Sequence, residues 1–134
     1  LLGAAAAALA FRALRPEEGR PAFELAGYSP LLGTRCFAEF IGTFVLVLTV
    51  GLCVTLQSPS TALAAGAALA SMVYALGTVS GAHFNPAVTL AVVLGGRGRC
   101  SPGDGVAYVL TQATAGALAG LTYAQFHAAG PHSE

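Results

Sequence analysis

The sequence predicts an all-α membrane protein with three transmembrane helices and one re-entrant half-helix, arranged as one half of an inverted-repeat fold. Three observations predict this class. Hydrophobic residues make up 55% of the 134 residues and charged residues only 9%, and the mean hydropathy is +0.71. Long apolar stretches flank a short one that starts with Asn85-Pro86. Broken helices from two repeats that meet at the bilayer midplane are a known design of membrane channels and transporters.

Residues 1–35 are expected to form a flexible cytoplasmic segment. They begin with an alanine-rich run of eleven residues, Leu1 to Phe11, which is too short to span a bilayer. It could be part of a targeting segment or of an upstream helix. The rest combines arginines and glutamates with three prolines, a composition typical of disorder.

The first two membrane helices are predicted at about 36–56 and 61–79, with a very short turn between them. The second helix is rich in alanine and glycine, and Ala62, Gly66 and Ala70 recur at every fourth residue. Small residues at this spacing let another helix approach closely. The second helix should therefore present a smooth packing face.

A half-helix is predicted at 86–95. Asn is a favoured N-cap and Pro a favoured first helical residue, so the helix should begin at Pro86 and stop at Gly95-Gly96. About ten residues give roughly 15 Å of helix, half of a bilayer core. The dipeptide alone would also fit a turn before an amphipathic cytoplasmic helix, but the apolarity and the flanking segments favour a re-entrant half-helix.

A third spanning helix is predicted at about 105–126, and residues 129–134 would start an extracytoplasmic loop. Four arginines precede the first helix and two lie between the half-helix and the third helix, whereas the turn after the first helix has none. The positive-inside rule then places the N-terminus and the half-helix loop in the cytoplasm. A half-helix that ends at the midplane needs a partner from a second half to complete a pore.

Residues 80–89, Ser-Gly-Ala-His-Phe-Asn-Pro-Ala-Val-Thr, resemble the first signature of the aquaporin (major intrinsic protein, MIP) family. Residues 38–43 resemble the opening of the family's first membrane helix, and residues 108–112 the start of its third. The resemblance covers residues 36 to about 127. It implies a passive channel, completed by a second Asn-Pro-Ala half-helix and assembled as a homotetramer.

Asn85, with Pro86 and Ala87, is the predicted centre of the pore. Its amide can donate to a solute oxygen while its carbonyl oxygen caps the helix, and a donor beside a positive helix end opposes cations. Gly81, Ala82 and His83 should lead into the half-helix in an extended run with their carbonyls facing the lumen.

Glu39 is the one acid inside a predicted span, and such a residue indicates a functional site, although near a helix end it could simply reach the interface. The resemblance implies that Glu39 and Gln112 support the half-helix loop. His83 could pack to fix that loop or titrate as a gate.

The resemblance also supplies lining positions. Ala65 matches one member of the family's outer constriction, where a small residue would admit glycerol or urea, and the apolar pore wall would comprise Leu46, Leu69 and Val88, which by periodicity alone could face lipid or core instead. The family's usual glycine three residues after Gln112 is here Ala115, with Gly116 next. Either the close contact moves by one residue or alanine suffices.

The predicted function is a passive transmembrane channel for water and small uncharged solutes such as glycerol or urea, embedded in the lipid bilayer. No enzyme, metal, cofactor or nucleic-acid partner is expected, because the sequence shows no catalytic constellation, no metal cluster and no basic excess. Since the chain begins without Met, we expect a fragment. Alternatives are a non-conducting half-channel or regulatory partner of complete channels, and an unrelated anion channel with a midplane half-helix.

Overall fold

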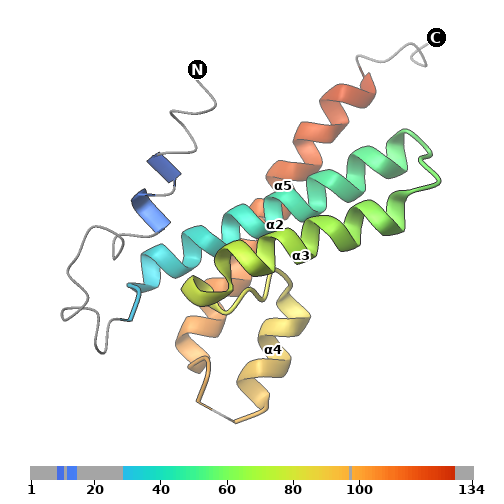
Figure 1. Cartoon of the computed structure of the whole chain (residues 1–134). Helices are drawn as coiled ribbons and strands as arrows, with labels where there is room; N and C mark the ends of the chain where they lie inside the picture. The colour runs from blue at the N-terminus through green and yellow to red at the C-terminus, as the bar shows by residue number, and fades with distance from the viewer. Residues whose placement is uncertain (1–8, 11, 15–28, 97, 129–134) are drawn as a thin grey trace.

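The protein was analysed as a computed structural model that describes residues 9–10, 12–14, 29–96 and 98–128 (Figure 1). The described chain contains helices and turns and no strand. Its four long elements are α2 (Leu32–Thr55), α3 (Thr61–Ser80), α4 (Pro86–Leu94) and α5 (Pro102–Ala128). Most of the predicted N-terminal segment (1–8, 11 and 15–28) and the predicted loop 129–134 lie outside the described residues.

Helices α2 and α5 begin several residues earlier than predicted. Residues 32–35, expected in the flexible segment, form the first turn of α2, where Arg35 is held by an ion pair with Asp104. Helix α5 begins at Pro102 rather than near 105, because the Ser101 hydroxyl accepts a hydrogen bond from the Asp104 N–H and caps the first turn. Helix α4 begins at Pro86, where the Asn-Pro pair predicts a helix start.

Helix α2 is the centre of the structure. It packs against both α3 and α5, and α4 packs against α5. The α4–α5 turn lies at the bottom of Figure 1, and the α2–α3 turn lies at the upper right, the end toward which the C-terminal part of α5 rises. The start of α2, the end of α3 and the start of α5 thus share one end of the molecule.

Helices α2 and α3 are long and apolar enough to cross a membrane, by length and composition. Helix α5 is longer than either but is not among the described helices that meet this criterion. Polar side chains on α5 lower its hydropathy, among them Asp104, Gln112 and Gln125. By this criterion the described chain has two candidate spans, α2 and α3.

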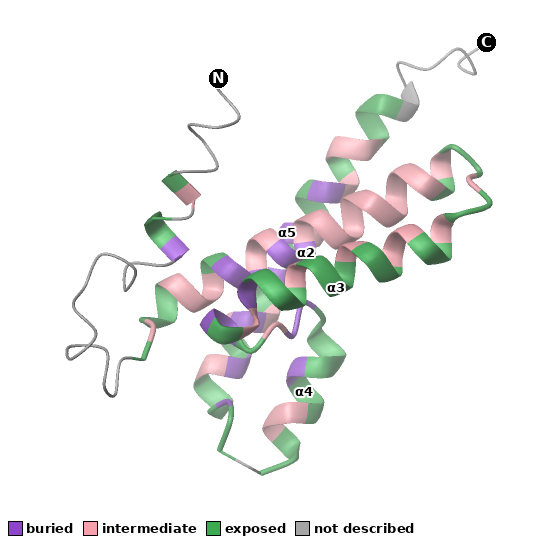
Figure 2. Cartoon of the chain, viewed as in Figure 1, coloured by how far each residue is buried: buried purple, intermediate pink, exposed green. Residues whose placement is uncertain are grey.

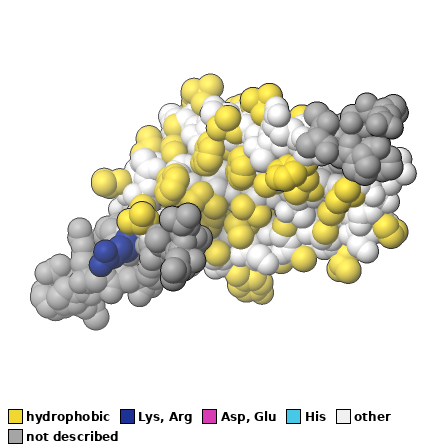
Figure 3. Space-filling view, turned by 90° about the horizontal axis from the view of Figure 1, so that it is seen from above, with side chains coloured by type: hydrophobic (Ala, Val, Ile, Leu, Met, Phe, Trp, Pro, Cys, Tyr) yellow, Lys and Arg dark blue, Asp and Glu magenta, His cyan; other side chains and the backbone are white. Residues whose placement is uncertain are grey.

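Much of the apolar surface is exposed. Buried residues gather where α2, the α3–α4 loop and α5 meet (Figure 2), and hydrophobic side chains are spread over the face seen in Figure 3. Tyr74, Leu63 and Leu94, for example, are 89%, 76% and 75% exposed. Such a surface suits lipid or further protein better than water.

The small residues of α3 and α5 differ in how closely they pack. A side chain at Gly66 or Gly116 would meet no described atom within 4 Å, so these glycines make no close helix contact within the described chain. On α5, Ala115 and Ala119 are both 0% exposed. Gly105 is buried as well, and a Cβ added there would lie 2.7 Å from Val93 Cγ2 on α4. Ala115 is therefore a buried contact of α5, whereas Gly116 meets no close neighbour within the described chain.

Candidate functional site

The site begins where α3 stops. Gly81 ends the helix in the left-handed conformation (φ 92°), and its N–H bonds to the Gly77 carbonyl. Ala82 and Phe84 also have positive φ, 53° and 49°, a region that non-glycine residues rarely adopt. The expected extended run through Gly81, Ala82 and His83 is therefore wrong: the loop is tightly folded, because its N–H groups turn inward to a carboxylate.

That carboxylate is Glu39 on α2, which is fully buried. Its Oε1 accepts hydrogen bonds from Ser80 Oγ (2.6 Å) and the His83 N–H (2.9 Å). Its Oε2 accepts from the Phe84 N–H (2.7 Å) and from Gln112 Nε2 on α5 (2.9 Å). Four donors compensate a desolvated carboxylate that would otherwise be very costly. Glu39 thus ties α3, the loop and α5 to α2.

A second set of contacts ties the loop to α4. His83 Nδ1 lies 3.1 Å from the hydroxyl of Thr89, which is 1% exposed. Gln112 Nε2 donates to the same hydroxyl (3.0 Å), and the hydroxyl contacts the Asn85 carbonyl oxygen at 3.2 Å. The sequence analysis predicted roles for His83 and Gln112 but not for Thr89. Thr89 could have been noticed, because a hydroxyl within an apolar helix needs a hydrogen-bond partner when it is buried.

Asn85 is the N-cap of α4. Its Oδ1 accepts the Ala87 N–H (2.8 Å) and its carbonyl accepts the Thr89 N–H (3.0 Å). Asn85, Pro86 and Ala87 are all exposed. No described residue accepts a hydrogen bond from the Asn85 amide nitrogen. This amide is therefore held by its oxygen and presents a free donor at the positive end of a helix dipole.

Phe84 holds the loop against α2. Its side chain is 2% exposed, and a Cβ added at Gly42 would overlap the phenyl ring. Only glycine allows this approach. The ring belongs to a small apolar cluster with Ala38, Leu76 and Val79.

The remaining candidate residues are not all brought together. An open hollow of about 430 Å³ is lined by Gly81, His83 and Val88 together with Arg35 and Arg99. Leu46 lines a separate hollow of about 320 Å³ beside Tyr123. Ala65 and Leu69 lie on α3 and line neither hollow.

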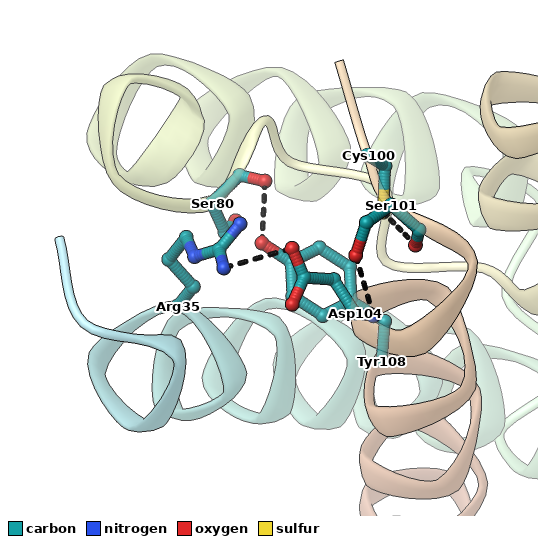
Figure 4. Close-up of polar contacts among 6 residues, drawn as sticks. All are labelled: Arg35, Ser80, Cys100, Ser101, Asp104 and Tyr108. Atoms are coloured by element: carbon teal, nitrogen blue, oxygen red, sulfur yellow. Dashed lines mark hydrogen bonds and ion pairs between the residues drawn. The ribbon is translucent and has the colours of Figure 1, made fainter. Parts of the chain in front are cut away.

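A cluster at the same end of the molecule was not predicted as part of the site (Figure 4). Arg35 Nη2 and Asp104 Oδ2 form an ion pair at 3.0 Å. Beneath it lies Tyr108, 1% exposed, whose hydroxyl donates to the Ser80 carbonyl (2.8 Å). A tyrosine within an apolar helix indicates a buried hydroxyl that needs a hydrogen-bond partner. The sequence does not show that this partner is the Ser80 carbonyl.

Within the described residues, no group of three His, Cys, Asp or Glu side chains could hold a metal ion. Cys36, Cys53 and Cys100 are free thiols. Burial raises the pKa of the Cys100 thiol, which lies in the turn before α5. The polar groups of the described site hold the loop backbone and present hydrogen-bond donors.

Comparison with known proteins relates this geometry to a family. The family profile described as "Major intrinsic protein" matches residues 29–130. The chain is 43% identical over 103 residues to aquaglyceroporin AqpS of Rhizobium meliloti, covering 69% of this chain and 43% of that protein. It is 43% identical over 91 residues to aquaporin-5 of Sus scrofa (63% and 33%). To aquaporin NIP1-4 of Oryza sativa subsp. japonica it is 42% identical over 93 residues (63% and 33%).

The chain thus spans a third to less than half of the length of these relatives. No solved structure matches it. The profile match and the two apolar helices define a membrane protein. The chain belongs to the major intrinsic protein family, which confirms the resemblance seen in residues 80–89 and removes the unrelated anion channel from consideration.

Proposed function

We propose that this chain forms the first half of a passive transmembrane channel for water and small neutral solutes. The relatives named above are aquaporins and an aquaglyceroporin, and the described residues offer a pore-type donor rather than a catalytic group. The function is conduction down a gradient without covalent chemistry, so the protein is not an enzyme.

In this proposal α2, α3 and α5 span the bilayer and α4 enters it from the cytoplasmic side and turns back. The ion pair between Arg35 and Asp104 supports a shared cytoplasmic end for α2 and α5. Helix α4 has 9 residues, about 14 Å at 1.5 Å per residue, which is half of the bilayer core. Its N-terminus then lies near the midplane, where an irregular loop is tolerated only beside protein or a water-filled cavity.

The observation that best supports the proposal is that the side-chain oxygen of Asn85 is already hydrogen-bonded while its amide nitrogen is not hydrogen-bonded within the described chain. Its oxygen is engaged by the Ala87 N–H, so the exposed amide can act only as a donor toward a passing oxygen. Together with the positive end of α4, this donor would orient water oxygen-first and oppose cations.

The loop would supply the acceptors. Within the described chain no donor bonds to the carbonyl oxygens of Gly81, Ala82 or His83, which leaves them available to solute. Glu39 and Gln112 hold the loop from behind through the hydrogen bonds given above. Their role is support, and neither contacts the solute.

Ala65 is assigned to the outer constriction, where its small side chain would admit glycerol or urea as well as water. Leu46, Leu69 and Val88 are assigned to the apolar wall. The hollow that Val88 shares with Gly81 and His83 supports its assignment to this wall beside the loop. A second half, which the length of the relatives suggests, would supply the opposing half-helix, and the complete channel would assemble as a homotetramer.

The test is osmotic. Proteoliposomes that contain the full-length protein should shrink faster than empty liposomes in a stopped-flow experiment, and should then re-swell faster with external glycerol. Faster shrinkage without glycerol entry would restrict the channel to water. Shrinkage no faster than that of empty liposomes would favour the alternative, a non-conducting half-channel or regulatory partner of complete channels.

A further inference from the structure

Tyr108 contacts the loop of the site at two points. Its hydroxyl donates to the Ser80 carbonyl at 2.8 Å, and its ring meets the His83 ring edge-on with centroids 5.3 Å apart. Ser80 also donates to Glu39. One aromatic side chain on α5 therefore touches the last residue of α3 and a residue of the loop that α3 enters.

A charged side chain also lies over the Tyr108 ring. The Arg35 guanidinium lies 6.0 Å from the ring centroid, within the range of a cation–π contact, and the same guanidinium pairs with Asp104 at 3.0 Å. Asp104 is fixed in turn by its own N–H, which donates to Ser101 Oγ (Figure 4). Because Asp104 and Tyr108 are four residues apart on α5, they lie on the same face of that helix.

We propose that Tyr108, held under the Arg35–Asp104 ion pair, is a positioning residue that sets the place of the asparagine loop in the pore. This inference rests on the proposed function. Glu39 holds the loop through its N–H groups, whereas Tyr108 fixes the Ser80 carbonyl and the His83 ring. These anchors act at different atoms, so losing one leaves the loop folded but less well placed.

The deciding variant is Tyr108→Phe, which keeps the ring and both ring contacts and removes only the hydroxyl. The matched control is Tyr123→Phe on the same helix, since within the described residues the Tyr123 hydroxyl bonds to nothing. Both variants are made in the full-length protein, and flux is normalised to the amount of reconstituted protein. Fewer folded channels would lower water and glycerol flux equally, whereas a displaced loop narrows the path and slows the larger solute more.

We expect Tyr108→Phe to lower water permeability about three- to tenfold, the effect of one lost buried hydrogen bond, and to lower the glycerol-to-water ratio further. Tyr123→Phe should change neither. Asp104→Asn should give a smaller loss of the same kind, and should add little once the Tyr108 hydroxyl is gone.

If the wild-type protein conducts and Tyr108→Phe leaves both permeability and ratio unchanged, the positioning role is wrong and the channel stands. An equal loss of both fluxes would also overturn it, because that is the signature of poor folding alone. If the wild-type protein conducts nothing, the proposed function fails and this inference fails with it.

Discussion

At the scale of the residue, the conformation of the α3–α4 loop depends on one buried carboxylate. Glu39 accepts four hydrogen bonds, from Ser80, His83, Phe84 and Gln112, and none of its surface is exposed. These donors come from α3, the α3–α4 loop and α5. A single carboxylate thereby fixes a backbone that local preferences would not maintain.

Glu39→Gln tests this dependence. The amide keeps the shape but offers one acceptor oxygen in place of two, so at least one buried donor faces another donor. We expect the free energy of unfolding to fall by about 2–3 kcal/mol, seen as a lower melting temperature in detergent. Thr114→Val is the control, because that exposed hydroxyl bonds only to its own helix. Equal melting temperatures for Glu39→Gln and the wild type would show that the carboxylate does not hold the loop.

Ala65→Phe tests the proposed constriction. A phenyl ring in place of a methyl group should exclude the larger solute, so glycerol flux should fall about tenfold while water flux stays within about twofold, as expected for a barrier change of about 1.4 kcal/mol for glycerol alone. Stopped-flow light scattering with each solute measures both fluxes. Ala68→Phe, on the same helix and likewise half-buried, is the control. Equal losses of both fluxes would argue against Ala65 as part of a filter.

At the scale of the element, the contact between α2 and the loop depends on a missing side chain. Gly42→Ala would drive a methyl group into the Phe84 ring and should cost about 1–3 kcal/mol of stability through overpacking. Gly33→Ala on the same helix meets no atom within 4 Å and serves as the matched control. The smaller side chain of Phe84→Leu should partly restore the melting temperature of Gly42→Ala. No rescue would mean that the two residues do not compete for this space.

The helices themselves could be predicted, because their signals are local. Apolar runs and the Asn-Pro pair predict four helices where the structure has α2, α3, α4 and α5, with shifts of a few residues at the ends. The start of α2 was missed because Arg35 finds its partner 69 residues away. Hydrophobic periodicity reports only local structure, so it cannot indicate a contact between residues this far apart in the sequence.

The site could be predicted only in part. The sequence singled out Glu39, His83, Asn85 and Gln112, and the structure places these residues in one hydrogen-bonded region. It did not predict the left-handed loop, since Ala82 and Phe84 have no intrinsic preference for positive φ and adopt it where Glu39 draws in the neighbouring N–H groups. Thr89, Asp104 and Tyr108 were missed as parts of the site, because the sequence does not show which distant residue each of them contacts.

At the scale of the whole molecule, the proposed topology places the α2–α3 turn and the α4–α5 turn on opposite sides of the membrane. After replacement of the native cysteines, a membrane-impermeant maleimide should label Ser60→Cys in intact cells. The same reagent should label Arg99→Cys only after the cells are permeabilised. Both positions are exposed in the structure, so accessibility within the protein does not bias the result. Labelling of both from outside would contradict a re-entrant α4.

The proposed channel depends above all on the Asn85 donor at the start of α4. The most direct test is to reconstitute the full-length protein with Asn85→Asp and measure water permeability and cation leak in the same proteoliposomes. Gln57→Glu makes the same amide-to-acid change at an exposed turn position and is the control.

We expect Asn85→Asp to lower water permeability about tenfold, a barrier increase of about 1.4 kcal/mol, and to raise cation leak, because a carboxylate replaces a donor with an attractive negative charge. Gln57→Glu should match the wild type in both respects. Water permeability and ion leak that are unaltered in Asn85→Asp would contradict the central claim that this side chain faces the path of the solute.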